Sequence, residues 1–271
     1  MDLRLKLCGI LREAGEQLRT ERRFSVTEKA GHANYVTDAD RRMESMLKQQ
    51  LRGLCPEARF IGEEEVSDRL TDEPTWVVDP IDGTTNFIHD YHMSAISAAL
   101  LTNRRPLVGA VVQPWLGEVY SAERGKGAFL NDAPMHVSGH DLAHALTGFG
   151  TSPYHPELSR PTMEIALKFM ECAADVRRCG SAALDLAYVA CGRQDIFFEL
   201  TLKPWDVAAG ALLVTEAGGV FDMPPLENPD FDTAGTILAA NALCAVPARA
   251  LLAEQMKKYG LDREAIMKLS D

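Results

Sequence analysis

The 271-residue chain lacks the sequence features of a membrane or secreted protein. No stretch approaches the ~20 uninterrupted apolar residues that a membrane-spanning helix requires. The first residues lead into an amphipathic pattern and contain no apolar signal-peptide core. These absences predict a cytoplasmic protein that has no membrane partner.

The chain is also short of positive charge and of paired cysteines. Its 28 Lys and Arg against 39 Asp and Glu give a net charge of −11, whereas a general nucleic-acid binder needs a basic face. A small phosphorylated substrate stays possible, because bound divalent cations can invert the field of an acidic site. The cysteines form no CxxC pair, which favours free buried thiols over zinc or disulfide chemistry.

What the chain does contain is an ordinary globular composition, 46% hydrophobic and 25% charged, with mixed periodicities. Helical spacing of apolar residues predicts helices over about 2–22, 38–52, 159–173, 181–191, 205–217 and 247–258. Strands are predicted at 59–61, 76–79, 94–101, 106–113, 118–122, 196–198 and 236–241. A mobile polar loop is expected up to Gly31. Without repeats or linkers, the pattern indicates a single domain over 1–271 with a layered α+β or α/β sandwich fold.

The strongest chemical signal is a pair of carboxylates at the end of an apolar strand. We expect the strand to end at Asp79, where Pro80 breaks the ladder, and a tight turn to aim Asp82 at the same point. Gly83 permits an unusual backbone angle, and the N–H groups of Gly83 and Thr84 could open a helix that receives a phosphate oxygen. Together these features indicate a Mg²⁺–phosphate site. The structural alternative is a strand–turn–helix junction with Asp82 as a simple N-cap.

Three further acidic segments lie far from this pair along the chain. Glu63, Glu64 and Glu65 are like charges at a strand end, which a cation would stabilise, although most such runs are solvated loops. Asp206 stands at the start of a helix of small residues, and Asp40 begins another helix. Taken alone, either could be an ordinary residue of a helix start.

In this order, the four segments resemble the signature of the inositol monophosphatase family. Residues 79–87 match the family pattern D-P-(I/L/V)-D-G-T-x-N-F throughout. Residues 205–210 match W-D-x-A-A-G and are followed by Glu-Ala-Gly-Gly at 216–219, while residues 177–188 are similar to bacterial members in particular. The resemblance covers nearly the whole chain and implies an αβαβα, sugar-phosphatase-like sandwich.

The resemblance implies hydrolysis of a phosphate monoester by two or three Mg²⁺ ions and an activated water, without a phosphoenzyme. The implied metal ligands are the carboxylates of Glu63, Asp79, Asp82 and Asp206 and the backbone carbonyl of Ile81. Asp79 would bridge two ions. Hard oxygen ligands suit Mg²⁺ better than imidazole does, so His89 and His92 are interpreted as loop or supporting residues.

Other residues match positions that orient water and substrate in the family. Thr84 and Asp40 match the pair that orients the attacking water, and Glu64 is a candidate to support Thr84 or the water. Lys29 aligns with a lysine that helps to close the site. The implied substrate-binding residues are Gly83, Thr84, Ser181, Ala182, Glu199 and Asp206, with Glu199 accepting hydrogen bonds from substrate hydroxyls.

The chain departs from the family pattern at three places. Glu65 replaces a usual serine, Asp38 adds a carboxylate near Asp40, and residues 222–225 replace a glycine-containing turn. None of these changes removes an implied metal ligand. Glu65 and Asp38 could change metal affinity or preference, and the sequence does not determine their effect.

Three functions are compatible with these residues. The first is hydrolysis of myo-inositol monophosphate or a similar small polyol or sugar phosphate. The second is the same chemistry on fructose bisphosphate, histidinol phosphate, NADP or phosphoadenosine phosphate. The third is a non-catalytic regulatory binding protein, which the intact carboxylates disfavour as a sole role. The resemblance further implies a homodimer, inhibition by Li⁺ and competition by Ca²⁺.

Overall fold

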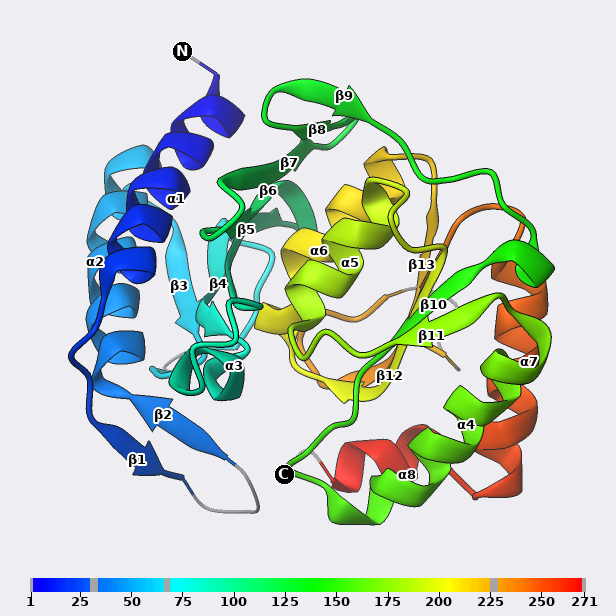
Figure 1. The fold of residues 1–271 in the computed structure, drawn as a ribbon. Coiled ribbons are helices and arrows are strands. Elements are labelled where there is room, and N and C mark those ends of the chain that lie inside the picture. The colour runs from blue at the N-terminus through cyan, green and yellow to red at the C-terminus, as the bar shows by residue number, and fades with distance from the viewer. Residues whose placement is uncertain (1, 30–33, 66–68, 225–228, 270–271) are drawn as a thin grey trace.

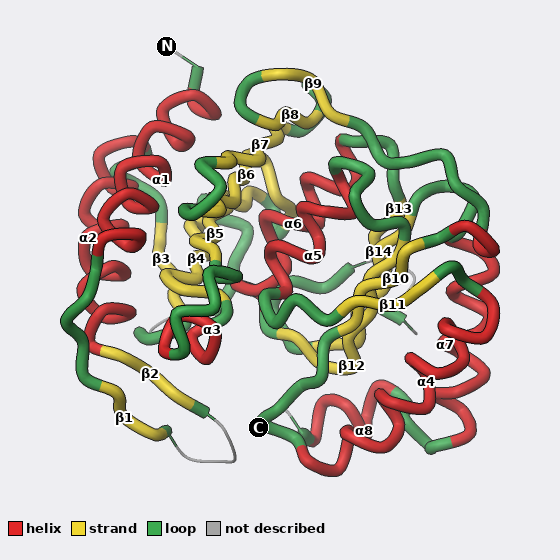
Figure 2. The backbone as a smooth tube through the Cα atoms, viewed as in Figure 1, coloured by secondary structure: helices red, strands yellow, loops and turns green. Residues whose placement is uncertain are grey.

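The computed structural model describes residues 2–29, 34–65, 69–224 and 229–269, which form five alternating layers of helices and sheets (Figure 1). The order of the layers is αβαβα, as the family resemblance implies. Two sheets each have helices on both faces, and Figure 2 shows the central helix pair between the two groups of strands. Among the described residues, no helix combines the length and the apolar character needed to cross a bilayer.

The first two layers are a helix pair and a seven-stranded sheet. The outer helices are α1 (Leu3–Thr20) and α2 (Asp38–Leu54). In spatial order the strands are β3 (Arg59–Gly62), β4 (Thr75–Asp82), β5 (Ala95–Thr102), β6 (Arg105–Gln113), β7 (Glu118–Glu123), β8 (Ala128–Leu130) and β9 (Ala133–Met135). Only β3 and β4 pair in parallel within this sheet. Leu7, Leu11 and Leu47 pack against its strands because helical spacing places them on one face.

The central layer consists of α5 (Ala182–Ala190) and α6 (Pro204–Glu216). Both helices are buried over most of their surface and carry many alanines, so neither shows the two-sided pattern of a surface helix. Leu186 and Leu213 join a core that also includes Val77 of the first sheet and Phe197 of the second. One continuous core therefore connects both sheets through these helices.

The second sheet has five strands and is covered by the last helices. Its spatial order is β11 (Asp175–Arg177), β10 (Leu146–Phe149), β12 (Ile196–Leu202), β14 (Gly235–Ala240) and β13 (Val220–Asp222). β10 runs parallel to β11 and β12, whereas β14 is antiparallel to both its neighbours. Its outer face carries α4 (Ser159–Cys172), α7 (Ala245–Lys258) and α8 (Arg263–Lys268). Short elements complete the fold: β1 (Val26–Glu28), β2 (Tyr35–Thr37), α3 (Thr84–Ile88) and two 3₁₀ turns, Leu142–His144 and Pro156–Leu158.

The structure corrects several expected elements. The polar stretch expected to be a mobile loop contains β1, which pairs with β2 as an antiparallel ribbon; residues 30–33 lie outside the described part. β4 does not end at Asp79 but continues through Pro80 to Asp82. A helix, α8, follows the helix expected to be last, and β10, β11 and β13 were not expected. These strands have only three or four residues, too few for a periodic pattern to stand out.

Candidate active site

The two aspartates of β4 meet because the strand is irregular. In a regular strand, side chains three positions apart point to opposite faces of the sheet. Here the pairing of β4 with β5 shifts: Asp79 lies opposite Ser97, and Asp82 lies opposite Ala95. Three steps on β4 therefore match two on β5, which is a bulge that re-aims a side chain. The N–H of Ile81 donates to Asp79 Oδ1 at 2.9 Å and fixes that carboxylate.

Asp206 reaches the same point from the start of α6. It is the third helical residue, and its Oδ2 accepts the backbone N–H of Lys203 at 2.7 Å. One carboxylate oxygen each from Asp79, Asp82 and Asp206 lie within 4.8 Å of one another. The structure thus brings together three of the carboxylates that the sequence singled out, although 124 positions or more separate the third from the pair.

Glu63 and Glu64 extend this acidic group from the end of β3. The N–H of Glu63 donates to Val78 O at 3.3 Å, which ties this end to β4. Lys29 Nζ lies 2.7 Å from Glu64 Oε1 and 3.5 Å from Glu63 Oε1. Lys29, placed at the site by resemblance, therefore does contact the acidic group.

Thr84 links the acidic group to α2. Its Oγ1 lies 3.1 Å from the carbonyl oxygen of Ile81 and 3.3 Å from Asp40 Oδ1. Asp40 is buried, and its Oδ2 accepts the N–H of Thr37 at 2.7 Å and the Thr37 hydroxyl at 2.6 Å. Asp40 is thus held in a capping box at the start of α2, with its other oxygen left for Thr84. Gly83 precedes α3 with a φ of +86°, the unusual backbone angle expected there.

Burial and mutual repulsion act together on these carboxylates. Burial raises the pKa of Asp79 well above its ordinary value, and the charges of Glu63, Asp82 and Asp206 raise it further. Burial likewise raises the pKa of Asp206, and that of Glu63 to about 7. Lys29 opposes this rise at Glu63 without cancelling it. A divalent cation would relieve the repulsion, and these oxygen atoms are the donors that Mg²⁺ prefers, so the residues fit such an ion.

A cavity of about 170 Å³ lies beside the acidic group. Its lining includes the expected substrate-binding residues Gly83, Thr84, Ser181, Ala182, Glu199 and Asp206. Glu199 is nearly buried, and Glu199 Oε1 accepts the N–H of Ser152 at 2.8 Å. A Cβ at Gly150 would overlap Glu199 Oε2, so only glycine leaves room for this carboxylate. Burial raises the pKa of Glu199 to about 7.

The lining also includes residues that were not foreseen, among them Tyr154, Arg178 and Asp185. Tyr154 is 46% exposed as a whole residue, but burial of its hydroxyl, followed by the charges of the acidic group, raises the pKa of that hydroxyl. Burial also raises the pKa of Asp185 to about 7. Arg178 and Asp185 lie in the run 177–188 that was noted only for its resemblance to bacterial proteins, so that run was the available signal. Tyr154 follows no pattern that could have found it.

The additional carboxylates that distinguish this chain have partners outside the acidic group. Glu65 Oε2 lies 2.6 Å from Lys48 Nζ, and its side chain is 60% exposed. Asp38 pairs with Arg42 and accepts the N–H of Ser25 at 2.6 Å. Asp38 therefore ties the segment before β1 to the start of α2. In the departing turn, Asp222 and Arg249 form an ion pair, whereas Pro225 lies outside the described residues.

The two histidines after the signature lie in a loop, as expected. His89 is exposed at the C-terminal end of α3. His92 Nε2 lies 2.9 Å from Asp90 Oδ1, and its ring stacks on Trp115 at a centroid distance of 5.2 Å. Neither contributes to the group of possible metal-binding side chains.

Known proteins resemble the chain over most of its length. A family model described as the inositol monophosphatase family matches residues 3–259. Inositol monophosphatase 3 of Solanum lycopersicum is 42% identical over 225 residues, which cover 79% of this chain and 82% of the relative. Inositol-1-monophosphatase of Rhizobium meliloti is 46% identical over 193 residues, covering 70% and 72%. The solved structure of an IMPase from Thermotoga maritima has a TM-score of 0.85 at 30% identity, covering 93% of this chain and 97% of that one.

Proposed function

Since this chain belongs to the inositol monophosphatase family and is a phosphoric monoester hydrolase, we propose that it hydrolyses myo-inositol monophosphate or a similar small polyol phosphate with the help of Mg²⁺. The observation that carries the proposal is the convergence of Asp79, Asp82 and Asp206 beside a small cavity that also contains Glu199. An interpretation as a binding protein alone is set aside, because the family is one of enzymes.

The proposed metal ligands are the carboxylates of Glu63, Asp79, Asp82 and Asp206 and the carbonyl oxygen of Ile81, for two to three Mg²⁺ ions. When bound, these ions would supply Lewis-acid chemistry and neutralise phosphate charge. The raised pKa values of Asp79, Asp206 and Glu63 support this proposal. They mean that the ionised carboxylates are not neutralised by nearby positive charge, which a bound cation would supply. Phosphoryl transfer depends mainly on positioning and charge neutralisation, which this arrangement can provide.

Thr84, Asp40 and Glu64 are the proposed catalytic residues. The Thr84 hydroxyl can donate its proton to Asp40 Oδ1 or to Ile81 O, which leaves its oxygen lone pairs free to accept a hydrogen bond from water. Asp40 cannot turn away, because Thr37 holds its second oxygen. Glu64 is held by Lys29 at the edge of the same group.

Gly83, Thr84, Ser181, Ala182, Glu199 and Asp206 are proposed to bind the substrate. The phosphate would lie near Gly83 and Thr84, at the start of α3. Glu199, at the other wall, can accept hydrogen bonds from ring hydroxyls. Because Glu199 is buried, each such hydrogen bond is stronger than it would be in water. A polyol fits this end better than an apolar alcohol, because Glu199 and Asp185 are both polar and buried.

Three further expectations follow from the family rather than from the geometry. We propose that the protein is a homodimer, that Li⁺ inhibits it, and that Ca²⁺ competes with Mg²⁺. We also propose that residues 1–271 act as one domain, which the core shared by both sheets supports.

The test is release of inorganic phosphate from myo-inositol 1-phosphate, with and without millimolar Mg²⁺. We expect turnover only with the metal. The same assay on fructose bisphosphate, histidinol phosphate, NADP and phosphoadenosine phosphate compares kcat/KM, which measures discrimination in the transition state. Higher kcat/KM for one of these compounds would move the assignment to that substrate, and no turnover of any ester would refute the proposal.

A further inference from the structure

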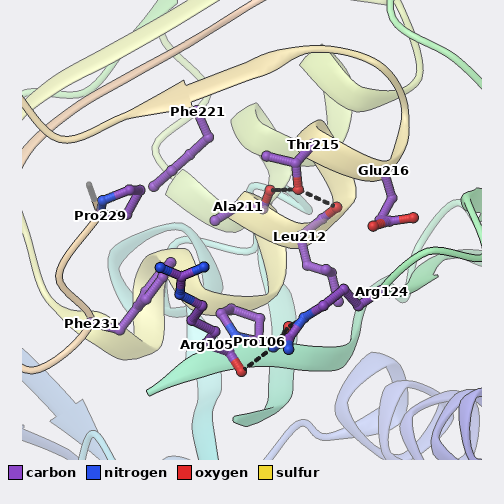
Figure 3. Close-up of a pocket in the computed structure, with 10 residues that line it drawn as sticks. All are labelled: Arg105, Pro106, Arg124, Ala211, Leu212, Thr215, Glu216, Phe221, Pro229 and Phe231. Carbon is purple, nitrogen blue, oxygen red and sulfur yellow. Dashed lines mark hydrogen bonds between the residues drawn. The ribbon is translucent and has the colours of Figure 1, made fainter. Parts of the chain in front are cut away.

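A second cavity lies beside the C-terminal half of α6, whereas Asp206 is at the N-terminal end of that helix. This cavity is larger than the one beside the acidic group. Its volume is about 270 Å³, close to the lower end of the ~300–1,000 Å³ typical of small-molecule pockets. The lining comes from the start of β6, the turn after β7, the second half of α6, β13 and the segment before β14 (Figure 3). The residues that line it from α6 begin five positions after Asp206, roughly 8 Å further along the helix axis.

One wall of this cavity is apolar and aromatic. Phe221 and Phe231 are stacked, with ring centroids 6.2 Å apart and an interplanar angle of 13°. Leu212 of α6 and Pro106 of β6 add aliphatic surface. A flat ring would find apolar contacts on several sides here.

The cavity also contains a charged group, the guanidinium of Arg105, for which the described residues provide no carboxylate partner. Arg105 is exposed and forms no side-chain hydrogen bond or ion pair with any part of the chain that the structure describes. Its neighbour Arg104 instead lies 3.5 Å from Asp72 and 3.8 Å from Asp232, so nearby carboxylates are directed elsewhere. Arg105 therefore places a positive charge beside the apolar wall, in a chain whose net charge is −11.

The other charged groups of the lining are already engaged. Arg124 Nε donates to the carbonyl oxygen of Pro106 at 2.8 Å, and its Nη2 donates to that of Arg105 at 2.6 Å. Glu216 accepts the N–H groups of Gly125 and Gly127, both at 2.9 Å. Figure 3 shows Glu216 on the other side of the cavity from Arg105. Arg124 contributes positive charge without a carboxylate partner among the described residues, so the cavity as a whole favours an anion.

We propose that this cavity binds a small monoanion built from one apolar ring and a carboxylate. The carboxylate would pair with the Arg105 guanidinium, whose fork of N–H donors matches two carboxylate oxygens. The ring would lie against Phe221 and Phe231. A phosphate dianion fits less well, because the lining has a mostly apolar surface and only one guanidinium that the described residues leave unpaired. The site is separate from the phosphatase site and does not depend on that assignment.

The test uses 3-phenylpropionate as the probe and follows the methyl resonances of Leu212 by NMR in the full-length protein. A dissociation constant on the order of 1–10 mM is expected for a probe of about eleven non-hydrogen atoms. The neutral analogue 3-phenylpropan-1-ol should bind at least about tenfold more weakly, because it cannot pair with Arg105. Saturating inorganic phosphate and Mg²⁺ should leave probe binding unchanged.

Arg105→Gln should weaken probe binding about tenfold, and Arg105→Lys should restore part of it. The matched control is Arg104→Gln, the adjacent arginine that does not line the cavity, which should bind within twofold of the wild type. Both positions are exposed, so the fold should survive either change. Equal binding of acid and alcohol, unchanged binding in Arg105→Gln, or displacement of the probe by phosphate would each overturn the proposal.

Discussion

The hydroxyl of Ser181 donates a hydrogen bond of 2.6 Å to Asp82 Oδ2, which joins the end of β4 to the start of α5. The same oxygen of Asp82 accepts the N–H of Ala183 at 2.7 Å. Ser181 is also the N-cap of α5, since its Oγ accepts the N–H of Leu184. One serine therefore both begins a central helix and orients a carboxylate of the acidic group.

Ser181→Ala should affect stability and activity together. Loss of the cap and of the buried hydrogen bond should cost about 1–2 kcal/mol of unfolding free energy. Asp82 would lose a donor that fixes its orientation, so we expect roughly 10-fold weaker Mg²⁺ activation. Asp141→Ala removes the side-chain cap of a different, exposed helical turn and should leave Mg²⁺ activation unchanged. Unaltered Mg²⁺ dependence in Ser181→Ala would show that the serine acts only as a cap.

Asp79→Asn should abolish activity without loss of the fold. The metal-free variant should even unfold at a higher denaturant concentration than the wild type at mildly alkaline pH, because one of several repelling buried charges is gone. Mg²⁺ should then stabilise the wild type, by about 2.7 kcal/mol at a concentration 100 times its dissociation constant, and the variant much less.

The control for this variant is Asp90→Asn, which changes an exposed aspartate close in sequence. It should unfold and respond to Mg²⁺ as the wild type does. Retained turnover in Asp79→Asn would refute the assignment of Asp79 as a metal ligand.

Local sequence located the two aspartates of β4, but for a partly mistaken reason. The expected break at Pro80 does not occur; a bulge within a continuing strand brings Asp79 and Asp82 to one side. A bulge depends on how the neighbouring strand pairs, and no window of sequence contains that information. Glu63 and Asp206 could be joined to the pair only through the family resemblance, because the sheets that bring them close are assembled from distant segments.

The surroundings of Tyr154, Glu65 and Asp38 depend on tertiary contacts, which the sequence alone does not reveal. Tyr154 lines the cavity because the second sheet places its loop there, and that sheet mixes parallel and antiparallel pairs. The sequence left open whether Glu65 and Asp38 change metal affinity. In the structure each pairs with a basic side chain of α2, Lys48 or Arg42. The positions of Glu65 and Asp38 in the sequence indicated that they lie near the acidic group, but not where their side chains point.

Lys29→Gln should tighten Mg²⁺ binding. Burial alone would lower the pKa of Lys29, but Glu63 and Glu64 outweigh it and raise that pKa, so the ammonium stays charged. This fixed positive charge competes with a divalent cation for the same carboxylates. Its removal should lower the Mg²⁺ dissociation constant by a factor of about 3–10, measured by thermal-shift titration.

Lys48→Gln is the matched control for Lys29→Gln. Lys48 pairs with Glu65, the next glutamate along the chain, and that pair is more exposed to solvent. Its loss should change Mg²⁺ affinity by less than about twofold. Equal effects of the two substitutions would mean that only net charge matters, and weaker Mg²⁺ binding in Lys29→Gln would contradict the competition argument.

Glu199→Gln should stabilise the metal-free protein, relative to the wild type, much more at about pH 8 than at about pH 5. The pKa of Glu199 is raised by burial to about 7, above the ordinary 4.5, so the folded state holds this proton more tightly than the unfolded state does. The protonated carboxyl therefore supports folding below about pH 4.5, and that support is lost as pH rises to about 7. The amide of the variant cannot ionise, and its oxygen can still accept the N–H of Ser152. The advantage of the variant should grow by roughly 2–3 kcal/mol between about pH 5 and about pH 8.

Urea unfolding in EDTA between about pH 5 and about pH 8 measures this difference for Glu199→Gln. Asp185, the other buried carboxyl of the cavity with a pKa of about 7, is present in both proteins, so its contribution cancels to first order. Glu171→Gln, at an exposed position of α4, should follow the wild type at every pH. If the curve of Glu199→Gln stays parallel to that of the wild type, the Glu199 carboxyl is not buried in solution as it is in the structure. The same variant should lower kcat/KM for inositol phosphate, since glutamine offers substrate hydroxyls a weaker, uncharged acceptor.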